Sequence, residues 1–284
     1  MNGKKLSIII IILSLIVVSV GGYIAYNAII NKEEQKKESN KEDNINENTT
    51  NDEALSLSLD DEIVKKLYAY VSYSEAYSNT YSEYYFYKNK ELNSNNFGNK
   101  EKFLYAFNLI NYDEIEIFES GGNSNVETKI KIPYSTYGKA LKKLFGDNVQ
   151  YDKNDISGAF AISKSIDGHN WISIKYDESN NSYVGSVGWV GGSSCGGINK
   201  KLIGVTKVET KIILVEEFLF INCRDQKIYA DYENKILIGN VSQELQDNED
   251  EYINKYMYEA NLVTYTFELG TDDEYHFVSS QVAK

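Results

Sequence analysis

The hydrophobic and polar positions divide the chain into an apolar start, a polar stretch and a long mixed remainder. From Leu6 to Ile30 the chain carries no charge and consists mainly of Ile, Leu and Val. A helix of this length would reach about 37 Å, which exceeds the roughly 30 Å of a hydrocarbon core. The pattern predicts a transmembrane helix preceded by a cytoplasmic tail, 1–5. A signal peptide cleaved near Gly21 is the alternative, but the apolar run continues well past that position.

The polar stretch, 31–53, is dominated by Lys, Glu, Asn and Asp and is almost devoid of apolar residues. Such a segment cannot bury enough surface to offset its ordering entropy, so we expect a disordered charged tether. Basic residues are more numerous after the apolar run than before it, which alone would keep the remainder inside. The head with Lys4 and Lys5 is instead typical of a signal anchor. We expect a single-pass protein of the cell membrane with its C-terminal domain outside the cytoplasm.

The remainder, 54–284, is long enough for one large domain, or for a helical part, 54–150, and a β-rich part, 151–284. Apolar residues recur at intervals of three and four from Ile63 to Tyr84, which predicts a helix that ends or bends before Asn93. The same spacing predicts further helices, and Gly146 follows one of them at a C-cap position. These further helices are expected at 99–111, 135–145 and 247–258.

Alternation of apolar and polar residues predicts strands, separated by turns such as Asp167-Gly168 and Asn180-Asn181. A hairpin is expected between Ile115 and Ile132. Further strands are expected at 159–163, 171–176, 183–190, 205–215, 218–222, 262–269 and 275–279. The order of these elements indicates an α+β domain, with N-terminal helices packed on a mainly antiparallel sheet.

Composition narrows the classes of partner. The chain carries a net charge of −13, from 42 acidic and 29 basic residues. Binding to nucleic acid or to anionic lipid headgroups depends on clustered positive charge, so both are disfavoured. The lipid bilayer itself is expected as a partner only through the N-terminal helix.

Two cysteines, Cys195 and Cys223, lie in the part expected outside, where an oxidising compartment favours a disulfide between them. The alternative is two unrelated buried thiols. Cys195 also lies in a glycine-rich loop, 191–197, and would need His169 or His276 beside it to act as a nucleophile. A tight loop joined to Cys223 is the favoured interpretation.

No metal or cofactor is expected, since two histidines and two distant cysteines form no recognisable zinc set. Asp177, Ser179 and Asn181 begin like a calcium loop, but the required glycine and closing glutamate are missing, which favours a hairpin turn. Acidic pairs such as Asp272 with Asp273, or Glu216 with Glu217, are candidate catalytic carboxylates. In a chain with 42 acidic residues such pairs also arise by chance.

A stripe of tyrosines follows one face of the first predicted helix. Its members are Tyr70, Tyr73, Tyr77, Tyr81 and Tyr84. Tyrosine combines a flat apolar ring with a hydroxyl and is favoured where sugars or protein partners dock, so the stripe is a candidate ligand platform. Ordinary packing of the helix on a sheet is the alternative, and the favoured one.

These features predict a non-enzymatic, membrane-anchored module that binds a ligand or partner outside the cytoplasm, an envelope protein or a glycan. A cell-envelope hydrolase using Cys195 or paired carboxylates is the first alternative, and it requires one of these groups beside His169 or His276. An accessory or sensor subunit of a membrane complex is the second. No complete catalytic set is recognisable in the sequence, which favours the binding module.

Overall fold

The computed structural model describes the folded part of the chain in segments. They are residues 57–72, 81–120, 127–153, 156, 158–188, 197–222, 224–241 and 254–283. The predicted transmembrane helix, the tether and both cysteines lie outside these segments. Within them, every helix is too short or too polar to cross a bilayer.

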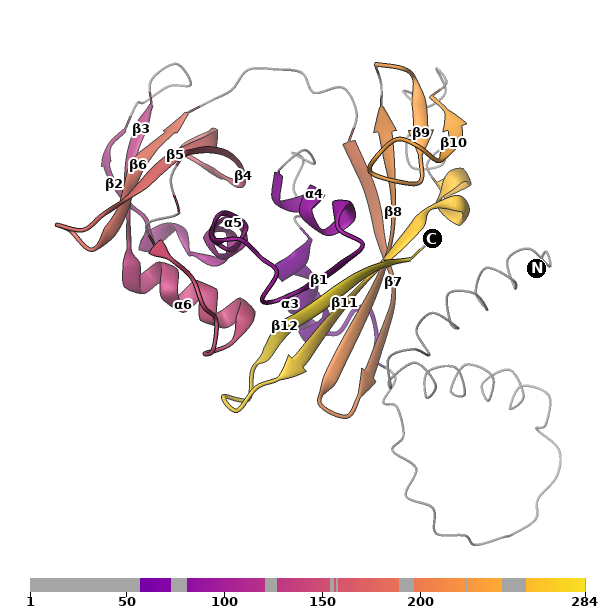
Figure 1. Ribbon diagram of the computed structural model, residues 1–284, viewed down its shortest axis with the longest axis horizontal. Helices are drawn as coiled ribbons and strands as arrows, with labels where there is room; N and C mark the ends of the chain where they lie inside the picture. The colour runs from indigo at the N-terminus through magenta and orange to yellow at the C-terminus, as the bar shows by residue number, and fades with distance from the viewer. Residues whose placement is uncertain are drawn as a thin grey trace, which may run out of the picture.

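Helices lie between two antiparallel sheets, so the expected α+β class is confirmed (Figure 1). The α-helices with bounds inside these segments are α3 (Glu62–Val71), α4 (Tyr81–Lys88), α5 (Asn99–Leu109) and α6 (Tyr134–Phe145). Residues 254–256 are also helical, whereas the earlier part of the helix predicted at 247–258 lies outside the described residues. Two short 3-10 helices accompany them, η1 (Tyr112–Glu114) and η3 (Met257–Glu259). α6 contacts both sheets, and so does α4, which makes the helices a central layer.

The first sheet has seven strands. They are β1 (Glu91–Asn93), β7 (Gly197–Val208), β8 (Lys211–Asn222), β9 (Lys227–Tyr229), β10 (Leu237–Asn240), β11 (Asn261–Leu269) and β12 (Tyr275–Ala283). β8 is its central strand, because β7 pairs along one edge while β11 and β9 share the other. β12 and then β1 extend the sheet beyond β11, and β10 extends it beyond β9.

The second sheet has five strands in the order β2-β3-β6-β5-β4. They are β2 (Glu116–Glu119), β3 (Thr128–Pro133), β4 (Gly158–Ile166), β5 (His169–Asp177) and β6 (Ser182–Gly188). The register of β4 against β5 breaks between Ala161 and Ile166, so the tip of this hairpin departs from the regular ladder. Asp167, at that tip, accepts hydrogen bonds from Ser120 and Thr128.

One hydrophobic core joins both sheets through the helical layer. Phe86 of α4 is surrounded by aromatic rings, with centroids 5.0 Å away for Tyr105, 5.1 Å for Tyr265 and 5.5 Å for Phe277. These rings come from α5, β11 and β12, so their burial fixes the helices against the seven-stranded sheet. Such edge-on and tilted ring pairs stabilise the core beyond the area that they bury.

Several predicted elements are confirmed, and two are corrected. The helices near 99–111 and 135–145, the hairpin around 115–132 and the final hairpin are all present, and Gly146 ends α6 with a φ of 80°. The first helix is shorter than predicted: it ends at Val71, because Ser72 is extended, with φ −119° and ψ 119°. The strand predicted at 205–215 is instead a hairpin that turns at Glu209 and Thr210.

Candidate functional site

The tyrosine stripe predicted on the first helix is divided by the end of α3. Tyr70 is 3 % exposed, and its ring meets Phe267 edge-on with centroids 6.4 Å apart. Tyr73 and Tyr77 lie outside the described residues, and so do the side chains of Tyr81 and Tyr84, although α4 contains both. For Tyr70 the structure favours packing. The ligand platform as a whole stays a prediction.

A different group of tyrosines converges beside the five-stranded sheet, and we call it the five-tyrosine cluster. Its members are Tyr134, Tyr137, Tyr151, Tyr176 and Tyr183. Ring centroids lie 5.1 Å apart for Tyr137 and Tyr183, and 5.4 Å apart both for Tyr137 and Tyr151 and for Tyr176 and Tyr183. Tyr137 and Tyr183 are fully buried, while the other three are half-buried. The cluster therefore has a buried floor and a partly exposed rim.

Local structure explains why these rings meet. Tyr134 and Tyr137 lie one turn apart on α6, on the face that neighbours share at a spacing of three. Tyr176 and Tyr183 are directly opposite each other in the β5–β6 hairpin. The backbone N–H of Tyr134 donates to the carbonyl of Asn181 at 3.1 Å, which ties the start of α6 to the hairpin turn.

The loop after α6 brings in Tyr151, and α5 holds this loop in place. The backbone N–H of Asp152 donates to the Asn99 side chain at 2.9 Å, and the Lys102 ammonium donates to the carbonyl of Gln150. Lys102 is 6 % exposed, and burial lowers its pKa. A buried ammonium group placed on one carbonyl is a specific anchor, so Tyr151 is positioned by the scaffold.

A cation lies at the rim of the cluster. Lys153 Nζ donates to the Tyr176 hydroxyl at 2.9 Å, and that hydroxyl donates to the Asn181 side chain at 2.6 Å. The same Nζ is 4.4 Å from the ring centroid of Tyr176 and 5.5 Å from that of Tyr134, within the range of cation–π attraction. The hydrogen bond to Tyr176 raises the pKa of Lys153 above its ordinary value, so the rim carries a positive charge at neutral pH.

The floor of the cluster contains two buried hydroxyls, those of Tyr137 and Tyr183, that have no hydrogen-bond partner among the described residues. Burial, followed by the neighbouring tyrosines, raises the pKa of both phenols. A buried hydroxyl without a partner costs free energy, and such groups in native proteins require an explanation. The described residues therefore leave the hydrogen-bonding capacity of these two hydroxyls unused.

A second set of tyrosines meets a carboxylate in the seven-stranded sheet. Glu216 of β8 is fully buried, and its Oε1 accepts from the hydroxyls of Tyr87 at 2.6 Å and Tyr265 at 3.0 Å. Its Oε2 accepts from the hydroxyl of Tyr68. Glu217, the other half of the predicted acidic pair, is half-buried and faces the other side of the strand. The two carboxylates therefore do not share one site.

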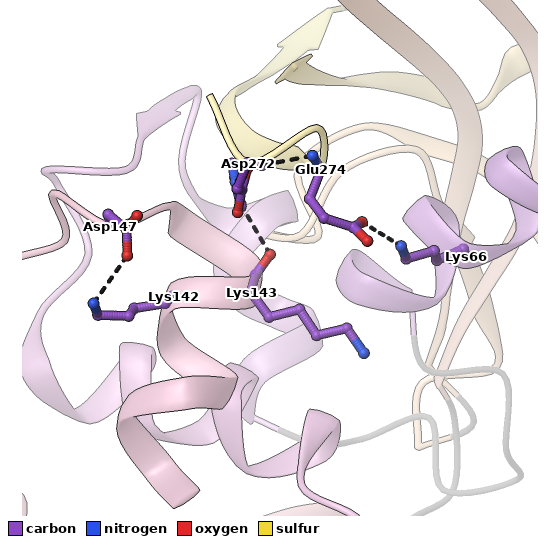
Figure 2. Close-up of polar contacts among 7 residues, drawn as sticks. Lys66, Lys142, Lys143, Asp147, Asp272 and Glu274 are labelled. Atoms are coloured by element: carbon purple, nitrogen blue, oxygen red, sulfur yellow. Dashed lines mark hydrogen bonds and ion pairs between the residues drawn. The ribbon is translucent and has the colours of Figure 1, made fainter. Parts of the chain in front are cut away.

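The two candidate catalytic histidines, His276 and His169, lie in different surroundings. His276 Nε2 is 3.0 Å from Asp272 Oδ1, and its Nδ1 is 3.1 Å from the carbonyl oxygen of Lys143 at the end of α6. Figure 2 shows Asp272 and Lys143 among the surrounding ion pairs. The hydrogen bond from His276 lowers the pKa of Asp272. His169 is buried, with Nδ1 2.9 Å from the carbonyl oxygen of Asp167.

The segment that begins like a calcium loop is a hairpin turn, as the favoured interpretation predicted. Asp177 Oδ1 accepts from the backbone N–H of Ser179 at 3.0 Å and from its hydroxyl at 2.7 Å, and Oδ2 accepts from Asn180 at 2.6 Å. These hydrogen bonds lower the pKa of Asp177. In the described part of the chain, His, Cys, Asp and Glu side chains nowhere gather in threes that could hold a metal ion.

Comparison with known proteins assigns this chain to no family. No protein-family model matches the chain, and neither a curated protein nor a solved structure is significantly similar to it. The candidate sites in the described segments are the two tyrosine clusters and the surroundings of the histidines. Of these, the five-tyrosine cluster alone combines partly exposed rings with buried hydroxyls that lack a partner among the described residues.

Proposed function

We propose that this chain is a membrane-anchored binding module that holds its α+β domain outside the cytoplasm and contacts a ligand there through the five-tyrosine cluster. The observation that carries the proposal is the pair of buried hydroxyls, on Tyr137 and Tyr183, beneath three half-buried rings. Binding sites combine an apolar, aromatic lining with a few placed polar groups, and this cluster has both. The envelope of the cell, its glycans or its proteins, supplies the ligand.

The anchoring part of the proposal rests on the apolar run from Leu6 to Ile30 and on the tether that follows it. A run of this length is sufficient to span a bilayer. The tether lets the domain reach ligands at a distance from the lipid surface. The location outside rests on the signal-anchor pattern, and the Cys195–Cys223 disulfide belongs to the same proposal.

The hydrolase alternative receives less support. A general base needs a ring nitrogen that is available to take a proton from the nucleophile. Both ring nitrogens of His276 face acceptors, the carboxylate of Asp272 and the carbonyl of Lys143. Asp272, one of the predicted catalytic carboxylates, does lie beside His276, as this alternative requires. In the described part of the chain, the hydrogen bonds of His276 reach Asp272 and Lys143 only, and neither supplies a serine or cysteine nucleophile. This histidine therefore ties α6 to the β11–β12 turn.

A binding experiment tests the role of the cluster. Full-length protein in lipid nanodiscs is mixed with insoluble cell-envelope material, and the bound fraction is measured after sedimentation. Tyr134→Ala removes a half-buried ring of the rim, while Tyr232→Ala removes a half-buried ring that packs on Phe220 in the other sheet. We expect Y134A to lose binding and Y232A to keep it. Equal binding by both variants would contradict the proposed role of the cluster.

The orientation is tested separately, by labelling whole cells with a membrane-impermeant maleimide before and after reduction. Labelling only after reduction is expected, because the domain would lie outside with Cys195 and Cys223 joined. Labelling that appears only after lysis would place the domain inside and overturn this part of the proposal.

A further inference from the structure

A histidine near the start of β12 lies between two hydrogen-bond acceptors. His276 is 9 % exposed; its Nε2 lies 3.0 Å from Asp272 Oδ1, and its Nδ1 lies 3.1 Å from the carbonyl oxygen of Lys143. A peptide carbonyl cannot donate a hydrogen bond, and the hydrogen bond from His276 lowers the pKa of Asp272, which keeps that group a carboxylate. Both contacts are therefore hydrogen bonds only when both ring nitrogens carry a proton.

A neutral imidazole can satisfy only one of these two acceptors. It has one N–H, and its other nitrogen presents a lone pair. In either tautomer that lone pair would face an oxygen lone pair, at 3.0 Å from Asp272 or at 3.1 Å from Lys143, so one contact would have to open. Imidazole is the side chain that gains or loses its charge between about pH 5 and pH 8, so this change falls near physiological pH.

The contact that opens is the one to the helix. A hydrogen bond to a carboxylate is stronger than one to a neutral carbonyl, so a neutral His276 keeps Asp272 and gives up Lys143. Lys143 belongs to the last turn of α6, whose final four carbonyls have no partner within the helix and form the negative end of its dipole. A cation at this position caps the helix, whereas a lone pair repels its end.

Close packing keeps the ring between the two acceptors. A Cβ atom at Gly270 would lie 2.8 Å from Nε2 of the His276 ring and 2.7 Å from Asp272 Oδ1, so glycine at this position leaves the space that the ring needs. The turn holds the carboxylate in place. The N–H of Glu274 donates to Asp272 Oδ1 at 3.2 Å, and the N–H of Gly270 donates to the carbonyl of Glu274 at 2.7 Å.

The other charged groups around His276 come from three elements. They are Lys66 of α3, Lys142, Lys143 and Asp147 at the end of α6, and Glu268, Asp272, Asp273 and Glu274 of the β11–β12 hairpin. The two ion pairs that Figure 2 draws, one between α3 and the hairpin and one at the end of α6, engage four of them. Glu268 lies opposite His276 in the ladder. In the described part of the chain, Asp272 alone places a carboxylate within hydrogen-bond distance of the ring.

We infer that His276 is a pH-dependent latch: its imidazolium caps the end of α6 at the Lys143 carbonyl while it holds Asp272 of the β11–β12 turn, and loss of one proton releases α6. The latch joins the helical layer to the seven-stranded sheet, because α6 also packs on α5 and on β12. It is closed at mildly acidic pH and open above neutral pH. It acts within the fold, so it does not depend on the ligand of the five-tyrosine cluster.

Hydrogen exchange of the full-length chain in nanodiscs, followed by mass spectrometry at about pH 6 and about pH 8, tests the latch. The readout is the protection of the backbone amides at 142–148, at the end of α6, relative to the exchange rate of an unfolded chain at the same pH. We expect protection to be roughly ten-fold lower at the higher pH, because one charge-assisted hydrogen bond is lost.

Three variants separate the latch from a general effect of pH. His276→Gln cannot gain a proton, so its protection should be the same at both pH values. Asp272→Asn presents an amide that can donate to Nε2 or accept from it, so a neutral His276 can still donate to Lys143, and protection should stay high at both pH values. Asp273→Asn is the matched control. It removes the same charge from the next residue, where asparagine tolerates the φ of 62°, and should keep the ten-fold change.

The inference fails if the unchanged chain is equally protected at both pH values, or if the ten-fold change persists in H276Q or in D272N. Loss of the change in D273N as well would assign it to the charge of the turn and would also overturn the latch. Should H276Q not fold, D272N decides, because the Asp272 side chain is 49 % exposed and its replacement disturbs no buried site.

Discussion

Each of the two sheets has its own cluster of tyrosine hydroxyls, and the clusters differ in what these hydroxyls meet. On the seven-stranded sheet, the hydroxyls of Tyr68, Tyr87 and Tyr265 all donate to the carboxylate of Glu216. On the five-stranded sheet, the buried hydroxyls of Tyr137 and Tyr183 have no partner in the described part of the chain. Tyr87 and Tyr265 are buried as Tyr137 and Tyr183 are, so the difference between these pairs lies in hydrogen bonding.

The difference assigns a structural role to the Glu216 cluster and is the ground for proposing a binding role for the five-tyrosine cluster. A buried carboxylate is strongly unfavourable unless hydrogen bonds replace its hydration, and Glu216 receives three of them. The donors come from α3, α4 and β11, so this network holds the helical layer on the sheet. A network with every member satisfied gives rigidity, whereas unpaired members weaken the fold. The five-tyrosine cluster retains such a cost, which a ligand would remove.

The largest effect is expected from removing the centre of the satisfied cluster. Glu216→Ala leaves the buried hydroxyls of Tyr87 and Tyr265 without their acceptor and opens a cavity, which should lower the free energy of unfolding by roughly 3–5 kcal/mol. Urea unfolding followed by tryptophan fluorescence measures it. Glu259→Ala, at an exposed glutamate, serves as the control. Unchanged stability of E216A would show that the carboxylate network does not hold the helices.

The next largest effect is expected from removing single hydroxyls. The change in the free energy of unfolding should differ in sign between the two clusters. Tyr87→Phe removes a hydrogen bond to a carboxylate and should lower the free energy of unfolding by about 1.5–3 kcal/mol. Tyr183→Phe removes a buried hydroxyl without a described partner, so without ligand the stability should stay equal or rise by up to about 1 kcal/mol. The same urea titration compares them. An equal loss in both variants would mean that Tyr183 has a partner within the protein.

Most of the fold could be predicted because its signals are local. The apolar spacing near 135–145 and the stop at Gly146 define α6, and alternation defines the strands of the last hairpin. The end of the first helix at Ser72 has no such signal, since no glycine or proline marks it. The turn at Glu209 also lacks the usual turn residues, and β-branched residues on both sides continue the alternation. The alternating pattern therefore predicted one continuous strand where the chain forms a hairpin.

The candidate site could be predicted only in small part, because tertiary structure assembles it. The tyrosine stripe was recognised by its helical spacing, whereas the five-tyrosine cluster draws on a helix, a loop and two strands. The one usable signal was the turn at 180–181, which places Tyr176 opposite Tyr183 in the hairpin. Glu216 interrupts an apolar strand pattern, and in a chain with 42 acidic residues such an interruption gives no signal of a buried site. Its three donors are distant in sequence, so no local pattern indicates its burial.

The smallest difference between the clusters is expected in their response to alkali. Burial raises the pKa of Tyr87, Tyr265 and Tyr137 well above the ordinary value of 10.0, and the Glu216 charge adds to the shift for the first two. A raised folded pKa contributes stability that is fully present below the unfolded pKa and is lost as the pH rises above it. Stability should therefore be insensitive to these groups near neutrality and fall above about pH 10.

Urea midpoints measured from about pH 8 to about pH 11, together with tyrosinate absorbance, check this expectation. Tyr183→Phe removes one group with a raised pKa, so the stability of this variant should fall less steeply with pH than that of the unchanged chain. Glu216→Gln removes the charge that adds to the shifts of Tyr87 and Tyr265, but burial, the larger cause, still raises both pKa values, so the slope should change by a smaller amount. If every tyrosine titrated near its ordinary pKa while the domain stayed folded, neither cluster would be buried as described.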